Sequence, residues 1–532
     1  MTGITTIGRR VKKMKRALLT MLCCLVAAVA LAAPLKIGWA SGPIHDGRTH
    51  TQIFGQHYLR WDRDGTLDPL TATCLVIDNG EDQLIFLSVD TSNFGYGNPF
   101  GQYVMKILAA TAPDLPQDKI IAGATHTHTG GDMAGASVPG YLKKNVPRRA
   151  FTDQAIKAIA GIVKQAWDNR QPGKVAYGFS YAVVGHQRRA VYFRDRSKFP
   201  NASANAKLIH GHAVMYGKTD VDDFSHHETG ADATVNFLFT FDMEDKLTGA
   251  IVNIPCPSQC SEHMWALSAD YWANVRANLR SRYGEKLYIL PQCAAAGDLS
   301  PHLRSYQSAS KRKWRLKYGR PEKYEEEFNR SDIAERVGWA FDDAYGWAKK
   351  ELFTDLPIQN RRIPVSLLRF KPDKTDVENA KKVIEMLDGV DKQDPGKIKE
   401  PEVRKALQKK QASLRIAKNV LKKAESYDPK DTVDTFINVA RLGDVAFFSN
   451  PFELYMDYMH RLQARSPFEQ TFVIQLSMPG RGYYLGTERS RQNRGYGNVA
   501  ANSVVDPKGG QLMIETALKT LKEMHDNGKP KK

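Results

Sequence analysis

Two histidines at the end of a predicted strand are the residues of this sequence best suited to chemistry. The apolar residues 120–124 are followed by His126 and His128. In an extended chain, residues two positions apart point to the same side, so we expect the two imidazoles to lie side by side. Paired imidazoles suit a metal ion, or a metal ligand beside a general base. Pairs with this spacing also occur as structural histidines, so this segment alone leaves both interpretations open.

Two more segments place a thiol and a hydroxyl after an apolar stretch. Cys256 follows residues 250–254 and would bind zinc as a thiolate. It could equally pair with Cys260 or remain a buried thiol, and His263 is a reserve ligand. Ser300 follows the run of small residues after position 290. Its hydroxyl could attack a substrate, donate to an oxyanion or cap a helix.

A carboxylate and one further strand end complete the set. Glu453 follows the apolar residues 445–448, where it could bind a metal or face the N-terminus of the next helix. A fifth polar segment, residues 476–488, also follows a predicted strand. Sites in α/β proteins gather beyond the carboxyl ends of strands, so these groups are expected to converge. Imidazole, thiolate and carboxylate are zinc ligands, and a catalytic zinc lowers the pKa of its bound water to about 7.

Together these segments resemble the N-terminal catalytic domain of the neutral ceramidase family, from about residue 35 to about residue 524. The most specific motif is Thr-His-Thr-His-Thr-Gly-Gly at residues 125–131. The segment Gly-Asp-Leu-Ser-Pro at 297–301 is similar to the family's Gly-Asp-x-Ser-Pro. Residues 450–453 are similar to its Pro-Gly-Glu segment, and residues 482–487 to its Gly-Tyr-x-x-Thr segment.

The resemblance implies a zinc ion and a set of catalytic residues. Zinc would be bound by His126, Glu453 and Tyr484, with Cys256 standing where the family has a third histidine. A thiolate there donates more charge and weakens the metal as a Lewis acid. The implied catalytic residues are His128 for proton transfer, Ser300 as nucleophile or positioning hydroxyl, Tyr484, and Arg188 (or Arg189). The implied reaction is hydrolysis of a lipid-like N-acyl amide, with ceramide split into sphingoid base and fatty acid.

The elements that must position these residues alternate along the chain. Apolar segments at 74–77, 84–89, 120–124, 250–254, 287–290, 445–448 and 472–476 predict strands. Helical periodicity covers residues 150–167, 271–282 and 333–352. The fold class is therefore α/β (mixed α+β), a single large catalytic body over residues 33–525 with a mixed sheet flanked by helices. The Lys/Glu-rich residues 370–430 predict an inserted, solvated helical hairpin, and residues 526–532 a disordered tail.

The first 32 residues have the character of a secretory signal peptide. A basic, acid-free beginning leads into an apolar run that ends in Ala-Leu-Ala at residues 30–32. An uncleaved anchor is the alternative. Export to the periplasm or the medium is expected, and the six cysteines are too few for a disulfide framework. One or two disulfides remain open.

The chain's charge and composition leave room for other functions. The formal net charge of +18 allows peripheral contact with an anionic membrane surface, while no motif indicates nucleic acid as a partner. Besides an exported zinc-dependent amide hydrolase, two alternatives remain. One is an exported, non-catalytic binder of anionic glycan or lipid surfaces. The other is a zinc hydrolase of ester or phosphoester bonds.

Overall fold

The computed structural model describes residues 34–56, 58–94, 100–135, 149–319, 326–478 and 483–527. The predicted signal peptide and residues 528–532 lie outside these ranges. The last helix, α12 (Pro507–Asn527), continues two residues into the segment predicted to be a disordered tail. Residues Leu35–Lys532 form one compact unit, and the description below concerns this unit.

Three main sheets with the same internal order form the body. The first contains β1 (Lys36–Pro43), β4 (Thr71–Asp78), β5 (Gln83–Val89) and β6 (Ile120–Ala124), with β7 (Gln171–Pro172) at its edge. The second contains β8 (Lys174–Tyr181), β13 (Thr234–Phe241), β14 (Leu247–Ile254) and β15 (Tyr288–Cys293). The third contains β17 (Ile358–Leu368), β18 (Thr432–Leu442), β19 (Val445–Ser449) and β21 (Gln470–Ile474). Each predicted strand overlaps one of these.

The pairing pattern is repeated in all three sheets. The first three strands pair antiparallel and the last two pair parallel. A parallel pair needs a crossover, and each crossover contains a helix: α2 (Phe100–Thr111), α5 (Tyr271–Tyr283) or α10 (Met456–Arg465). Another helix follows each last strand: α3 (Ala150–Asp168), α7 (Glu326–Ala348) or α12. The predicted mixed α/β class is confirmed.

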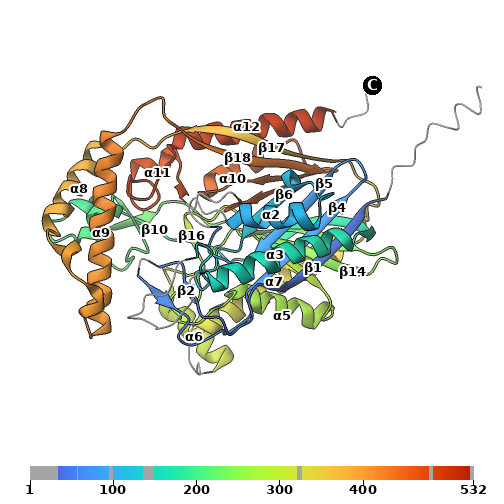
Figure 1. The fold of residues 1–532 in the computed structure, drawn as a ribbon, viewed down its shortest axis with the longest axis horizontal. Helices are drawn as coiled ribbons and strands as arrows, with labels where there is room; N and C mark the ends of the chain where they lie inside the picture. Colours follow the sequence, from blue (N-terminus) through green and yellow to red (C-terminus); the bar gives the residue numbers. More distant parts are fainter. Residues whose placement is uncertain are drawn as a thin grey trace, which may run out of the picture. The chain divides into compact units, whose positions relative to one another are not determined.

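The sheets share one apolar core and are covered on their outer faces by helices. Side chains from all three sheets meet in that core, as where the rings of Phe86 and Phe447 lie 4.8 Å apart. Figure 1 shows α2 and α3 lying over the first sheet. Helices α5 and α7 cover the second sheet, and α10 and α12 the third. Because both faces are covered, the strands are almost continuously apolar rather than alternating.

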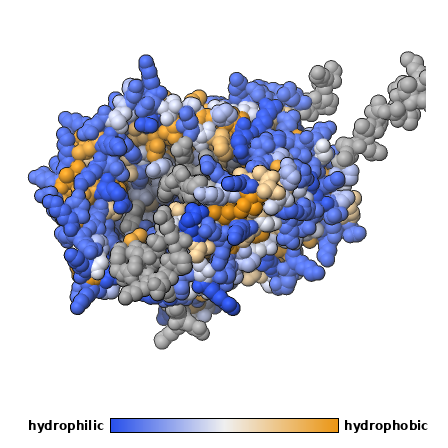
Figure 2. All heavy atoms as spheres, in the orientation of Figure 1, coloured by the Kyte–Doolittle hydropathy of each residue, from blue (hydrophilic) through white to orange (hydrophobic). Residues whose placement is uncertain are grey.

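The charged segment 370–430 lies between two long paired strands, β17 and β18. They pair from Ile358 and Leu442 to Leu368 and Thr432, so the segment extends from the far end of a β-hairpin. It contains α8 (Lys374–Met386) and α9 (Pro401–Glu425), which pack through Ala380, Val383, Leu414 and Ala417. Figure 2 shows a mainly hydrophilic surface where Figure 1 places these helices.

Shorter elements connect these parts and build the site. They are β2 (Gln52–Ile53), β3 (Arg60–Trp61), β9 (His186–Gln187), β10 (Arg189–Tyr192), β11 (Ala213–Met215), β12 (Phe224–His227), β16 (Leu299–Ser300), β20 (Glu453–Leu454), β22 (Tyr484–Leu485), α4 (Ala204–Ile209), α6 (Gln307–Tyr318) and α11 (Glu488–Gln492). Within the described ranges, no helix has both the length and the hydropathy to cross a bilayer. Cysteines 74, 256, 260 and 293 are buried free thiols.

Candidate active site

The repeated sheets direct the carboxyl ends of their parallel strands toward one region. His126 follows β6, Cys256 follows β14, and Glu453 follows β19. The backbone at His126 has a φ of 60°, a conformation that non-glycine residues rarely adopt outside functional sites. This turn, directly after a rigid buried strand, directs the imidazole inward.

His126 and Glu453 form the centre of the site. The carbonyl oxygen of Ser92 lies 2.6 Å from His126 Nδ1, so Nδ1 must carry a hydrogen and donate it. The other ring nitrogen, Nε2, lies 3.2 Å from Glu453 Oε2. Both atoms are buried, and neither has a hydrogen-bond partner in the described structure. With Nε2 unprotonated, two electron-pair acceptors face each other and a bound cation would satisfy both; with Nε2 protonated, the imidazolium and the carboxylate form an ion pair.

Strand pairing places Tyr484 beside Glu453. The short strands β20 and β22 pair in parallel with Glu453 opposite Tyr484, and the Tyr484 hydroxyl hydrogen-bonds the Glu453 carboxylate. Gly297 contacts the backbone here so closely that a Cβ would lie 2.5 Å from the carbonyl oxygen of Glu453. The glycine of the Gly-Asp-Leu-Ser-Pro segment is therefore required for this close approach.

The charges around Glu453 keep its carboxyl ionised. Burial alone would raise its pKa, but His126, the hydroxyl of Tyr484 and the guanidinium of Arg188 outweigh burial and lower the pKa below its usual value. Burial and the neighbouring carboxylate raise the pKa of Tyr484, which therefore remains a neutral phenol and a hydrogen-bond donor.

Arg188 is a buried cation beside these groups. Its Nη2 donates to the carbonyl of Gly297 at 2.9 Å and lies 3.3 Å from the Tyr484 hydroxyl. Its Nη1 donates to Gln259 Oε1 at 3.0 Å and to the Tyr216 hydroxyl at 3.1 Å. Arg189, the alternative from the sequence, points to the other side of its strand and pairs with Glu228.

Gln259 connects Arg188 to His128 and determines the tautomer of that histidine. Because Gln259 Oε1 accepts from Arg188, its amide nitrogen faces His128 and lies 2.7 Å from Nε2 and 3.2 Å from Nδ1. The shorter contact favours Nε2 as the acceptor and the proton on Nδ1, which lies 3.6 Å from Glu262 Oε2. Burial lowers the pKa of His128 and favours the neutral ring. The rings of His126 and His128 are 4.9 Å apart.

Ser300 lies next to this network but not on its open side. It is fully buried on β16, its Oγ accepts from the backbone N–H of His302 at 3.2 Å, and it hydrogen-bonds Tyr216. The cavity described below is lined by Tyr216 and not by Ser300. This position suits a residue that supports Tyr216 better than one that attacks a substrate.

The structure does not bring Cys256 to the His126–Glu453 pair. Its thiol donates to the carbonyl of Pro257 at 3.4 Å, and burial raises its pKa well above the usual value, so it is protonated. His263 is mostly exposed on the other side of Glu262. Within the described ranges, no three His, Cys, Asp or Glu side chains form a group that could hold a metal ion. Neither Cys256 nor His263 is therefore supported as the third ligand.

Two donors, His126 Nε2 and Glu453 Oε2, nevertheless have the spacing of zinc ligands, and the hydroxyl of Tyr484 lies beside Glu453. With zinc–nitrogen and zinc–oxygen bonds near 2.1 Å, two ligands of a tetrahedral ion are separated by about 3.4 Å. The observed separation of 3.2 Å between His126 Nε2 and Glu453 Oε2 agrees with this value. The carbonyl of Ser92 orients the His126 ring, as outer-shell partners of metal-binding histidines do.

A cavity of about 570 Å³ reaches Tyr484 from the surface, and its lining does not include His126 or Glu453. His128, Arg188, Tyr484 and Gln259 line its inner part, and Met215, Ile209 and Tyr496 add apolar surface. Arg60 fixes the backbone at this wall, since its Nη2 donates to the carbonyl of His128 at 2.6 Å. A carbonyl group bound here would meet the hydroxyl of Tyr484 and the guanidinium of Arg188 together.

Sequence reasoning missed three parts of the site. Gln259 lies three residues after Cys256, but nothing in its type or spacing marks it as the link between Arg188 and His128. Tyr216, with a φ of 58°, lies in a loop without a recognisable motif. Ser92 acts through its backbone carbonyl, which leaves no signal in residue type.

Comparison with known proteins supports the fold. No protein-family model matches the chain, and no curated protein sequence matches it. A crystal structure of neutral ceramidase from Pseudomonas aeruginosa is similar, with a TM-score of 0.60 and 15% identity over 92% of this chain and 75% of that one. A structure described as ceramidase complexed with C2 is similar to the same degree, with a TM-score of 0.60 and 15% identity over 93% of this chain and 76% of that one. The chain thus has the fold of these ceramidase structures.

Proposed function

We propose that this protein is an exported, zinc-dependent hydrolase of linear N-acyl amides, similar in reaction to a ceramidase. The observation that carries the proposal is the buried pair of unpartnered acceptors, His126 Nε2 and Glu453 Oε2, 3.2 Å apart beside Tyr484. The ceramidase fold and the lined cavity support it. A protein whose surface only binds a polyanion would need neither this fold nor a lined cavity.

His126, Glu453 and Tyr484 would hold the metal. When bound, zinc would supply a water molecule of lowered pKa and a Lewis acid for the amide carbonyl. Arg188 is placed to donate to the oxygen that becomes negative as the carbonyl is attacked, and the Tyr484 hydroxyl would join it by releasing its hydrogen bond to Glu453. Because this guanidinium is buried and already fixed by Gly297 and Gln259, it needs little reorganisation during the reaction.

His128 would manage the protons. In the tautomer set by Gln259, the single lone pair of Nε2 accepts from the Gln259 amide, so His128 would take a proton from the attacking water once that hydrogen bond is released. The imidazolium formed would be stabilised by the Glu262 carboxylate 3.6 Å from Nδ1, and could return the proton to the leaving amine. Ser300 would position Tyr216 and leave the attack to water.

The substrate class follows from the cavity and from the similar structures. A cavity of about 570 Å³ has room for an amide group and part of an attached chain. Arg188 and Tyr484 can meet a neutral acyl group, whereas the nearby carboxylates of Glu453 and Glu262 would repel an anionic phosphoester. We therefore favour amides over phosphoesters, with a lipid-like N-acyl amide as the substrate.

The test compares His126→Ala with wild type for zinc content and for turnover of amide, ester and phosphoester substrates. Loss of both bound zinc and amide hydrolysis is expected. Stoichiometric zinc in the variant would contradict the ligand assignment, and wild-type activity confined to esters or phosphoesters would contradict the substrate class. If the wild-type protein contains no metal, shows no turnover and binds polyanions, the alternative of a non-catalytic polyanion binder is favoured. N-terminal sequencing of protein from the medium or periplasm tests export.

A further inference from the structure

Exposed aromatic side chains lie on the edge strand of the second sheet and on α7, the helix that covers this sheet. Phe179 and Tyr181 point the same way from the edge strand β8, with ring centres 5.8 Å apart, and Trp347 of α7 is 6.5 Å from Phe179. Tyr181 is 67% exposed, and Trp339, two helical turns before Trp347, is 58% exposed. Exposed apolar clusters of this kind mark interaction sites. We call these four residues the aromatic face.

A basic helix borders the aromatic face. α6 carries Lys311, Arg312, Lys313, Arg315 and Lys317, contains no acidic residue and buries none of its side chains. The ammonium of Lys317 lies 6.0 Å from the centre of the Trp339 ring, which places helix and face next to each other. Leu316, between two of these cations, is 66% exposed.

The acidic residues of α7 neutralise Lys313 and Lys317 of this border and leave its arginines. Asp332 already pairs with Lys313 and Arg336, and Glu335 with Lys317. Asp342 pairs with Arg282, and Asp343 accepts a hydrogen bond from Ser180. Within the described ranges, no ion pair joins Arg312 or Arg315 to a carboxylate, so both remain available to an anionic partner.

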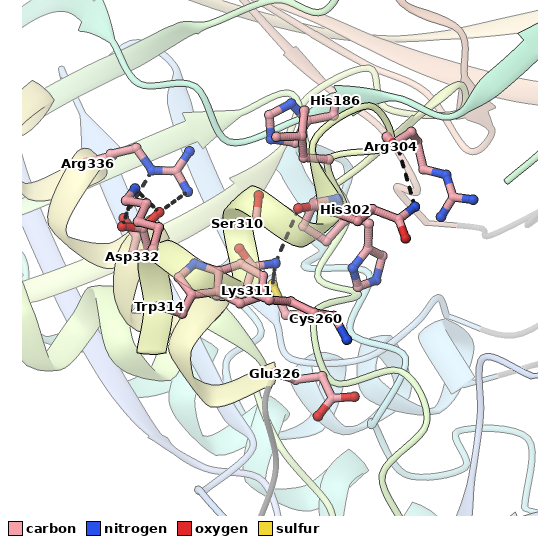
Figure 3. A pocket seen from close by; sticks show the side chains of 15 residues that line it. His186, Cys260, His302, Arg304, Ser310, Lys311, Trp314, Glu326, Asp332 and Arg336 are labelled. Carbon is pink, nitrogen blue, oxygen red and sulfur yellow. Dashed lines mark hydrogen bonds and ion pairs between the residues drawn. The ribbon is translucent and has the colours of Figure 1, made fainter. Parts of the chain in front are cut away.

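The same region leads to the active-site cavity. Figure 3 shows a second cavity, of about 370 Å³, with Lys311, Trp314, Asp332 and Arg336 from α6 and α7 and with His186 and His302 nearby. Arg336 donates to the carbonyl of Val183, just beyond the aromatic face on β8. The two cavities share His302 and Arg304 among their lining residues. The aromatic face, the second cavity and the catalytic cavity therefore follow one another.

We propose that the aromatic face and α6 together dock this protein on an anionic lipid bilayer. Trp and Tyr partition to membrane interfaces, and flanking Lys and Arg are attracted to acidic headgroups. When the protein is docked in this way, the cavity next to the active site would face the bilayer. The route for a membrane-embedded substrate rests on the proposed function, whereas the binding of the bilayer does not.

Sedimentation with phosphatidylcholine vesicles, with and without phosphatidylglycerol, tests the inference on the full-length protein. Arg312→Gln/Arg315→Gln is expected to weaken binding to the anionic vesicles about 30-fold, because each cation near such a surface contributes about 1 kcal/mol. Added salt should have a similar effect. Tyr181→Ser/Trp339→Ser should weaken binding to both vesicle types by about tenfold. All four side chains are exposed, so folding should be unaffected.

Lys381→Gln/Lys382→Gln is the matched control, since these exposed lysines lie on α8. The inference is overturned if wild type does not bind anionic vesicles, or if the control weakens binding as much as the α6 variant. Self-association that is abolished by Tyr181→Ser/Trp339→Ser, without vesicle binding, would show a protein interface instead.

Turnover measurements separate the two proposals. If only docking fails, a dispersed short-chain amide is hydrolysed while vesicles are not bound. If only the proposed function fails, the vesicles are bound and no amide is hydrolysed.

Discussion

Replacing Glu453 by glutamine should abolish zinc binding and yet stabilise the metal-free protein. Glutamine has the same shape, but its amide can place an N–H where Glu453 Oε2 now faces His126 Nε2 at 3.2 Å. In the metal-free wild type both acceptors are buried without a partner. A buried polar atom without a hydrogen bond costs about 1–3 kcal/mol, and a new hydrogen bond contributes about 1 kcal/mol. We therefore expect Glu453→Gln to unfold with about 1–3 kcal/mol more free energy than the chelator-treated wild type.

In the presence of zinc, wild type should be more stable than Glu453→Gln. A ligand present at about 1,000 times its Kd stabilises the folded state by about 4 kcal/mol. Wild type should gain this stability when zinc is added, and the variant should gain none. Urea unfolding at pH 8, with zinc or with chelator, measures all four free energies, and metal analysis gives the zinc content.

Two outcomes would refute the reasoning. Stoichiometric zinc in Glu453→Gln would show that this carboxylate is not a ligand. A variant less stable than metal-free wild type would show that His126 and Glu453 form a stabilising ion pair, since breaking a buried pair costs about 3–5 kcal/mol. Glu469→Gln, on the surface beside Tyr177, is the matched control and should change neither zinc content nor activity.

Three further predictions concern the surroundings of this pair. Ser300→Ala should keep kcat within about threefold of wild type and lose about 1 kcal/mol of stability with its hydrogen bonds; a loss comparable to that of His126→Ala would make the serine the nucleophile. Gln259→Leu should lower kcat about 100-fold at unchanged zinc content, because His128 loses the partner that sets its tautomer; full turnover would remove Gln259 from the mechanism. Burial, with Asp457 and Glu228 adding to it, raises the pKa of Asp298 to about 6. The folded protein then binds this proton more tightly than the unfolded chain does. The stability that protonated Asp298 contributes, about 3 kcal/mol, is therefore lost as the pH rises through about 6. Asp298→Asn should remove this loss and be more stable than wild type at pH 8 in urea unfolding, and a less stable variant would contradict the assignment.

Much of the framework was accessible from local patterns. Buried strands are long apolar runs, and the polar residues directly after them, such as His126 and Glu453, could be recognised by type and position. The mixed α/β class follows from the alternation of such runs with helical periodicity. The threefold repetition of the sheet order was not visible, because the same pairing pattern is built from different residues and from connections of unequal length.

The sequence by itself determined which groups are available and that they follow strands, because residue type and hydrophobic period are local properties. Only the tertiary structure decided which of them meet. Tyr484 reaches Glu453 through the pairing of β20 with β22, and Arg188 faces the cavity while Arg189 faces away. Cys256, at a position where a metal ligand was expected, has a short side chain that ends in a buried, neutral thiol. The aromatic face likewise depends on one edge strand lying beside one helix. Such contacts join residues far apart along the chain, so they depend on the packing of the three sheets rather than on any local pattern.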